Sequence, residues 1–194
     1  KVDNLTDMYF SNRHNDLGLY RTVDFEFYKV DKDNLDNYLS GAKFSLYKLT
    51  CTDKEHNHDE LISKDKTDCW SLIRENVESQ SLFSSSKGNV IIEDILLNQE
   101  YRLIETKAPL GRIQSKTQWK IIIRSDNELE IGKEKILIEA IGDNSIFKYQ
   151  ENGTSNVEII PDEYLNLSGN TFKLTNELLI LPITGGKGMI LTAD

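Results

Sequence analysis

Short alternations of apolar and polar residues run through most of the chain. Seven segments carry this alternation or a brief apolar run, and both patterns are typical of β-strands. Clusters of Asp, Asn, Gly and Ser, which favour turns, separate the segments. Helical periodicity is weak, and residues 68–83 form the one modest helix candidate. The predicted strands are 23–31, 42–50, 88–95, 100–106, 118–125, 135–141 and 170–181.

Seven short strands in a chain of 194 residues predict an all-β sandwich around one core. Residues 1–20 are polar and unpatterned, so we expect a linker or the tail of a preceding domain. The sandwich is expected to span 21–180, and a separate tail is expected over 181–194. The chain begins on a polar run without an initiator Met, which favours a piece of a longer polypeptide.

One predicted strand places a lysine on its apolar face. With a period of two, Val23, Phe25 and Phe27 share a side, and Lys29 is the next residue on that side. Burial of an unpaired ammonium group is costly. Either the apolar stripe ends at Phe27 and Lys29 reaches the rim, or Lys29 is neutral in the core and has a chemical role.

Two other strands also end their apolar face on a polar residue. Glu105 shares a face with Leu103, and Asn176 shares a face with Leu174. Each of these residues taken singly reads as an ordinary strand end that reaches solvent. Together with Lys29 they supply an amine, a carboxyl and a carboxamide to one shared interior.

These three groups can form a covalent cross-link. Desolvation favours the free amine of Lys29 and the protonated form of Glu105. Lys29 can then attack the Asn176 carbonyl while Glu105 relays protons, and ammonia leaves. The reaction runs once per molecule and ties the first predicted strand to the last. The loop model used for disulfides gives such a closure a stabilisation of about 4–5 kcal/mol.

The segment YRLIETKAPLGR (101–112) looks like the E-box of Cna B-type (SpaA-like) domains of Gram-positive pilins and surface adhesins. The usual form is close to YxLxETKAPxGY, and Arg112 stands where that form has an aromatic residue. Residues 23–31 and 39–49 resemble the family's paired opening strands with its reactive lysine. KLTN (173–176) resembles the closing strand with its reactive asparagine.

The resemblance implies an immunoglobulin-like sandwich of reversed topology, enlarged by insertions at 51–69 and 126–165. It also implies an intramolecular isopeptide bond. In that bond Lys29 is the nucleophile, Asn176 is the electrophile and Glu105 is the catalytic proton relay.

LPITG (181–185) resembles the LPxTG sorting motif of proteins that sortases attach to the cell wall or to a pilus. The resemblance implies that a sortase attacks the Thr184 carbonyl, releases Gly185 and all that follows, and transfers Thr184 to an amine. Leu181, Pro182 and Ile183 complete the motif. GMILTAD (188–194) is shorter than the apolar helix and basic tail of a full signal, so we expect a truncated or replaced membrane-retention segment.

Cys51 and Cys69 flank a polar stretch that has two competing interpretations. A disulfide would close a surface insertion and stabilise the fold by roughly 3 kcal/mol. A metal site would use His56, His58 and Asp59, although their spacing matches no standard ligand set. Two free thiols are a third reading. We favour the disulfide, which implies a compartment outside the cytosol, and we expect no metal.

Composition excludes several partners and activities. A net charge of −9 argues against nucleic acid, which requires clustered Lys and Arg. The chain has no apolar run of eighteen residues, so we expect no membrane span. There is no GxSxG motif, and His14, His56 and His58 lie in polar segments, which indicates that the protein is not an enzyme. No cofactor is implied.

Two functions fit these features. The first is a structural subunit of a Gram-positive pilus, minor or basal because no YPKN-like acceptor motif is visible. Its partners would be sortase and either other pilin subunits or peptidoglycan, and it would lie outside the cell on the wall or pilus. The second is a wall-anchored adhesin that binds host matrix or glycan through 51–69 or 142–170. Binding by the chain alone would favour the adhesin.

Overall fold

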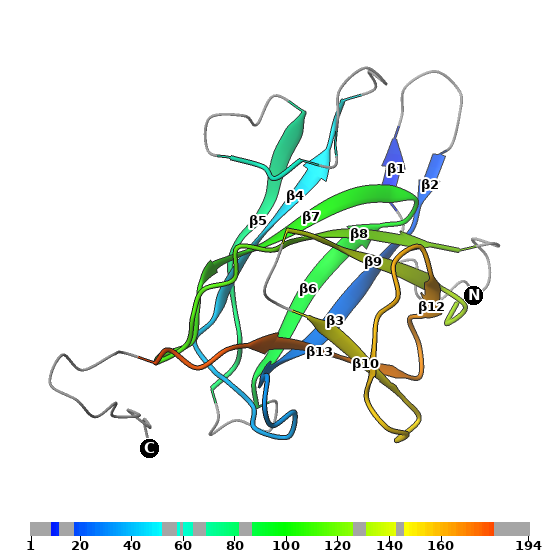
Figure 1. Cartoon of the computed structure of the whole chain (residues 1–194). Coiled ribbons are helices and arrows are strands. Elements are labelled where there is room, and N and C mark those ends of the chain that lie inside the picture. The colour runs from blue at the N-terminus through cyan, green and yellow to red at the C-terminus, as the bar shows by residue number, and fades with distance from the viewer. Residues whose placement is uncertain are drawn as a thin grey trace, which may run out of the picture.

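The computed structural model describes residues 9–11, 18–51, 58, 60–63, 69–81, 87–125, 131–142 and 146–180. Every regular element in these ranges is a β-strand (Figure 1). In chain order the strands are β1 (Tyr9–Ser11), β2 (Gly18–Tyr20), β3 (Thr22–Asp31), β4 (Lys43–Leu49), β5 (Trp70–Glu78), β6 (Asn89–Leu96), β7 (Gln99–Lys107), β8 (Gln118–Arg124), β9 (Lys135–Ile141), β10 (Phe147–Glu151), β11 (Val157–Glu158), β12 (Tyr164–Asn166) and β13 (Asn170–Asn176).

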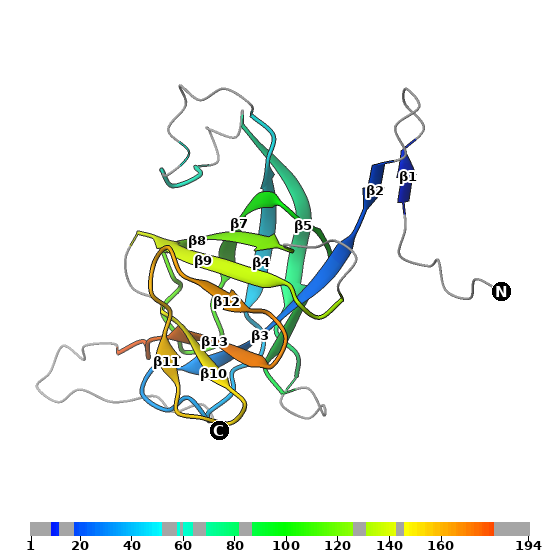
Figure 2. The ribbon, with the colours of Figure 1, turned by 90° about the vertical axis from the view of Figure 1, so that its right-hand side faces the viewer.

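Two sheets pack face to face, which confirms the predicted all-β sandwich. One sheet has the strand order β11-β10-β13-β3-β6, and the other has the order β12-β9-β8-β7-β4-β5. Figure 2 shows β7, β8 and β9 lying over β3, β10 and β13. Each sheet buries one face against the other, which is how a sandwich removes its apolar side chains from water.

The first and last long strands are neighbours. β13 pairs with β3 in parallel, with Leu174 opposite Lys29 and Asn176 opposite Asp31. The other strand pairs are antiparallel. Parallel strands need a long connection, and here almost the whole domain forms that connection.

Aromatic side chains from both sheets meet at the centre of the sandwich. The Phe27 ring contacts the Phe44 ring edge-on, with centroids 5.2 Å apart, and Trp119 contacts Phe147 edge-on at 5.5 Å. Edge-to-face packing is favourable because the positive ring edge meets the negative ring face. These rings, together with the surrounding Ile and Leu side chains, form one continuous core.

The predicted faces of three strands are confirmed. Phe25, Phe27 and Lys29 on β3 are all fully buried. Tyr101, Leu103 and Glu105 on β7 are buried, as are Phe172, Leu174 and Asn176 on β13. The polar residue that ends each apolar stripe therefore stays inside the sandwich instead of reaching the rim.

Two sequence-based expectations are wrong. The helix candidate 68–83 contains β5, an edge strand that pairs with β4 and supplies few buried side chains, which explains its weak alternation. The strand predicted over 170–181 ends at Asn176. Beyond that residue the chain leaves β3, and Leu178 instead forms an isolated bridge with Arg112.

Residues expected to be a linker contain a small hairpin. β1 and β2 pair with each other, and Figure 2 shows them projecting away from the two sheets. The interpretation of 1–20 as a linker or as part of a preceding domain stays a prediction, as do the other domain limits. Within the described ranges, no helix is long and apolar enough to cross a membrane.

Candidate functional site

The three predicted cross-link residues come from both sheets. Lys29 lies on β3 and Asn176 on β13, two positions apart in the parallel register. Glu105 lies on β7 in the opposite sheet, where it pairs with Phe44 of β4. All three side chains point into the space between the sheets, and Lys29, Glu105 and Asn176 are at most 1% exposed.

Lys29 makes two polar contacts through its amine. The Nζ atom lies 3.1 Å from Glu105 Oε1 and donates to the Thr175 carbonyl oxygen at 3.1 Å. It also lies 5.7 Å from the centroid of the Phe44 ring. Burial lowers the pKa of Lys29 to about 8, although the Glu105 carboxylate opposes this shift. Burial therefore shifts Lys29 toward the free amine relative to an exposed lysine.

Asn176 is oriented by two acceptors. Its Nδ2 donates to the Ile113 carbonyl oxygen at 2.7 Å and to Glu105 Oε2 at 3.1 Å. A backbone carbonyl can only accept, so the contact with Ile113 requires the nitrogen side of the carboxamide at that position. The Asn176 Oδ1 atom has no hydrogen-bond partner among the described residues.

Glu105 bridges the amine and the carboxamide with one carboxyl group. Oε1 faces Lys29, while Oε2 accepts from Asn176 and from the Ser115 backbone N–H at 2.8 Å. The Gln114 side chain donates to the Glu105 carbonyl oxygen at 2.9 Å, which holds the following loop against β7. One acid group thus touches both prospective reactants in a site without water-exposed side chains.

The arrangement suits transfer of an acyl group between side chains. A free amine is a nucleophile, a carboxamide is an electrophile, and a carboxyl with one oxygen on each can move protons between them. A fixed, dry site removes the entropic cost of bringing the reactants together. The assignment of Lys29, Glu105 and Asn176 to these roles stays a prediction.

A loop after β7 holds the chain that follows Asn176. The Ile113 N–H donates to the Glu177 carbonyl oxygen at 3.0 Å, and the Leu179 N–H donates to the Gly111 carbonyl oxygen at 2.9 Å. We call these paired segments, 111–113 and 177–179, the clasp. The clasp accounts for the early end of β13, because residues beyond Asn176 pair with this loop instead of β3.

Sequence reasoning missed the backbone partners of the site. The Ile113 carbonyl contacts the Asn176 carboxamide and the Ser115 N–H contacts the Glu105 carboxyl, yet a backbone group leaves no trace in residue type. It also missed the ion pair between Arg112 and Asp31, whose nitrogen and oxygen lie 2.7 Å apart. The unusual Arg at 112 was the one available signal.

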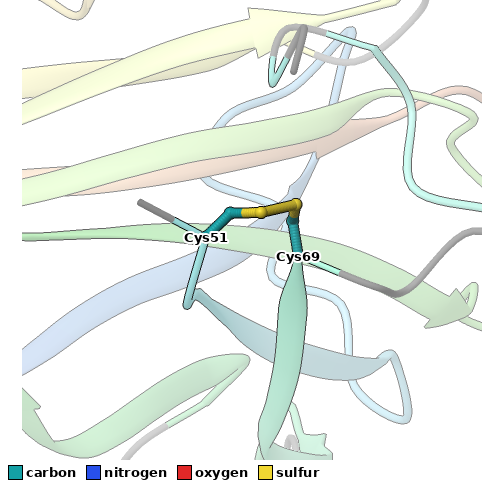
Figure 3. Close-up of a disulfide and its surroundings, with 2 residues drawn as sticks. All are labelled: Cys51 and Cys69. Atoms are coloured by element: carbon teal, nitrogen blue, oxygen red, sulfur yellow. A yellow bond between two sulfur atoms is a disulfide. The ribbon is translucent and has the colours of Figure 1, made fainter. Parts of the chain in front are cut away.

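Cys51 and Cys69 form a disulfide (Figure 3). Cys51 lies two residues after the end of β4, and Cys69 directly precedes β5. Their Cα atoms are 4.6 Å apart, as expected for cysteines at the ends of two paired strands. A ligand atom of His58 lies within 4.8 Å of both sulfurs. With both thiols in the disulfide, the structure favours the disulfide interpretation. His56 and Asp59, from the alternative metal interpretation, lie outside the described residues.

The described part of the 51–69 insertion is anchored to the outer face of the six-stranded sheet. The buried Arg102 guanidinium donates to the carbonyl oxygens of His58 at 2.6 Å and Glu60 at 3.0 Å. The Gln118 side chain exchanges two hydrogen bonds with the Ile62 backbone, each 2.8 Å long. The sorting motif with Leu181, Pro182, Ile183, Thr184 and Gly185 lies outside the described residues.

Comparison with known proteins places the chain among surface-protein domains. The family model for the SpaA prealbumin-like fold domain matches residues 23–135. This domain is typical of Gram-positive surface and pilin proteins and serves as a structural element, which agrees with a protein that is not an enzyme. The match includes Lys29 and Glu105, whereas Asn176 lies beyond its end. Comparison with curated proteins finds no match.

Proposed function

The chain belongs to the SpaA family of prealbumin-like fold domains, and from this premise we propose that it is a structural subunit of a Gram-positive surface pilus. The subunit stabilises itself by an isopeptide bond between Lys29 and Asn176. The observation that supports this function best is the Glu105 carboxyl, which contacts the Lys29 amine and the Asn176 carboxamide at 3.1 Å each. The disulfide fits an extracellular location.

The cross-linking step balances without any cofactor. The neutral Lys29 Nζ attacks the Asn176 side-chain carbonyl carbon, and the C–N bond to Nδ2 breaks. Glu105 begins as the neutral acid with its proton on Oε2. Oε1 takes the proton that Nζ loses, Oε2 passes its proton to the departing Nδ2, and Glu105 ends protonated on Oε1. The products are an amide between the two side chains and one ammonia. Each Glu105 oxygen already faces the atom with which it exchanges a proton.

The position of this bond explains its mechanical value. β3 and β13 are parallel neighbours near opposite ends of the chain, so tension on the two ends pulls these strands past each other. A covalent bond between Lys29 and Asn176 carries that load directly from strand to strand. The 146 residues between them are then shielded from unfolding under force.

Attachment to the pilus or the wall would use LPITG. Its likeness to the sorting motif supports cleavage between Thr184 and Gly185 and transfer of Thr184 to an amine of another subunit or of peptidoglycan. The absence of a YPKN-like stretch from the sequence favours a minor or basal subunit over a shaft subunit. Covalent chemistry inside the domain would resist force, and covalent chemistry at the tail would transmit it.

Intact mass under reducing conditions tests the cross-link. We expect the purified protein to be lighter than its sequence by one ammonia, and a protease digest to yield a branched peptide that joins Lys29 to Asn176. Glu105→Ala is expected to keep the full mass. Lys43→Ala, on the strand beside β7, is the matched lysine control and should still lose ammonia. A wild-type protein of full mass would overturn the cross-link.

The sorting step has its own test. A class of sortase that reads LPxTG, supplied with an amine acceptor, should release the peptide that begins at Gly185 and join the acceptor to Thr184. Thr184→Ala should prevent both products. If the wild-type chain stays intact while a control LPxTG substrate is processed, the attachment proposal is wrong, whatever the mass measurement shows.

A further inference from the structure

Arg112 forms an unusually sheltered ion pair next to the cross-link site. Its guanidinium lies 2.7 Å from Asp31 Oδ2, and the two side chains are only 11% and 13% exposed. Asp31 is two residues beyond Lys29 on β3 and stands opposite Asn176 in the parallel register. The E-box form of the family has an aromatic residue where this chain has Arg112.

Asp31 is a rigid anchor for the guanidinium. Its Oδ1 accepts from the Asp33 N–H at 2.9 Å, and its own N–H donates to the Asn37 carbonyl oxygen at 3.0 Å. Burial alone would raise the pKa of Asp31, but the Asp33 N–H and the Arg112 guanidinium outweigh that effect and keep the pKa below its ordinary value. The carboxylate is charged at neutral pH.

Arg112 in turn fixes the loop that orients the carboxamide. The Arg112 N–H donates to the Pro109 carbonyl oxygen at 3.1 Å, and Gly111 completes this turn with a φ of +71°. The next residue is Ile113, whose carbonyl oxygen holds Asn176 Nδ2 at 2.7 Å. The ion pair therefore holds the residue directly before Ile113, and the Ile113 carbonyl oxygen sets the orientation of the Asn176 carboxamide.

We propose that the Arg112–Asp31 ion pair is a positioning device that keeps the Ile113 carbonyl on the Asn176 carboxamide. This inference rests on the proposed cross-link. With Ile113 in place, the departing nitrogen faces the Glu105 oxygen that must protonate it. A carboxamide turned by half a rotation would set its oxygen against the Ile113 carbonyl, which is repulsive. Arg112 touches none of the reacting atoms and acts only through the loop.

The nearby Lys32–Glu177 ion pair provides a matched control. It starts from the same end of β3 as the Arg112–Asp31 pair, because Lys32 follows Asp31, but it reaches Glu177 instead of the loop that carries Arg112. Both of its side chains are 41% exposed, and neither is adjacent to Ile113 in the chain. Lys32→Ala therefore removes an ion pair from the same end of β3 without releasing the turn at Pro109–Arg112.

The test follows the rate of ammonia loss. Chains recovered unfolded and without the cross-link are refolded by dilution, and intact mass is recorded over time alongside circular dichroism of the folded fraction. Arg112→Gln keeps most of the side-chain stem and should slow cross-linking by about tenfold, the effect of roughly 1.4 kcal/mol on the barrier. Arg112→Lys should lose less, and Lys32→Ala should cross-link at the wild-type rate.

A charge swap separates positioning from general stability. The double variant Asp31→Arg with Arg112→Asp restores an ion pair at the same place, so it should cross-link faster than Arg112→Gln at an equal folded fraction. The inference is overturned if Arg112→Gln matches the wild type, or if Lys32→Ala slows the reaction equally. It is also overturned if the swap gives no recovery. A wild-type chain that never loses ammonia would instead refute the proposed function itself.

Discussion

Two lysine–glutamate pairs lie at the same end of β3 and differ mainly in burial. Lys29 and Glu105 contact each other at 3.1 Å with both side chains 0% exposed, whereas the side chains of Lys32 and Glu177 are both 41% exposed. Burial lowers the pKa of Lys29 to about 8, while the hydrogen bond that Lys32 donates to the Glu177 carboxylate raises the pKa of Lys32. The contact is common to both pairs, so burial is what shifts the pKa of Lys29 toward the free amine that the proposed cross-link requires.

We call Lys29–Glu105 the inner pair and Lys32–Glu177 the outer pair. The comparison also shows why the inner pair needs additional hydrogen-bond partners. A buried ion pair recovers its desolvation cost only when further hydrogen bonds satisfy its remaining polar atoms. Thr175, Ser115 and Asn176 supply those bonds to Lys29 and Glu105. The outer pair has water as its remaining partner. The inner cluster therefore concentrates polar groups at a position where their chemistry can stabilise the fold.

The largest expected effect comes from removal of the covalent bond. Asn176→Ala leaves the Lys29–Glu105 pair in place but removes the electrophile. We expect the free energy of unfolding to fall by about 4–5 kcal/mol, because the unfolded chain loses its closed loop. Guanidinium titration of the wild type and the variant measures this loss in the free energy of unfolding. Intact mass on the same samples shows whether the cross-link is present.

The matched change in the outer pair is Glu177→Ala, which removes one member of a pair at the same strand end. We expect this variant to retain the cross-link and to lose less than about 1 kcal/mol. Equal losses for the two variants would show that no covalent bond strengthens the inner site.

A smaller effect is expected from breaking each ion pair in a background without the cross-link. In Asn176→Ala, addition of Glu105→Ala leaves a buried ammonium without its carboxylate and should cost roughly 3 kcal/mol more. Addition of Glu177→Ala should cost less than about 1 kcal/mol, because water replaces the lost partner. Urea titration of the two double variants gives both values.

Lys29→Met in the same background sharpens this result. If the cost of Glu105→Ala arises from the unpaired ammonium, it should shrink once that ammonium is absent, because no buried charge then lacks a partner. A cost that is unchanged in the Met background would instead assign it to the loss of Glu105 packing and its contact with Ser115.

Period-two alternation predicted the all-β sandwich and placed Lys29, Glu105 and Asn176 on the apolar faces of their strands, but it left open whether their side chains reach the rim or stay buried. It works where one face of a strand is buried, as on β3. It fails on β5, because an edge strand exposes residues on both faces, including Leu72 and Ile73. Short strands such as β11 and β12 form through tertiary contacts, and two or three residues carry no period.

The surroundings of the site were less predictable than its members. The Ile113 carbonyl and the clasp depend on backbone geometry that residue types do not encode. The pairing of Arg112 with Asp31 joins positions that lie 81 residues apart in the chain, which no local pattern reports. Residue type at Arg112 marked a departure from the family form, but only the fold identifies its partner.

The smallest expected effect is a dependence of stability on pH that arises from the inner lysine alone. Since the pKa of Lys29 is about 8 in the folded state and 10.5 in the reference state, the unfolded chain binds more protons between these values. Stability should therefore rise with pH, by about 1 kcal/mol from about pH 7 to about pH 9 in Asn176→Ala.

Lys32 has a raised pKa, so its contribution to stability is complete throughout this window and declines only at higher pH. Urea titrations across the window, repeated with Lys29→Met and with Lys32→Met, separate the two. The rise in stability should vanish with Lys29→Met and persist with Lys32→Met. The opposite pattern would show that Lys32, and not Lys29, causes the pH dependence.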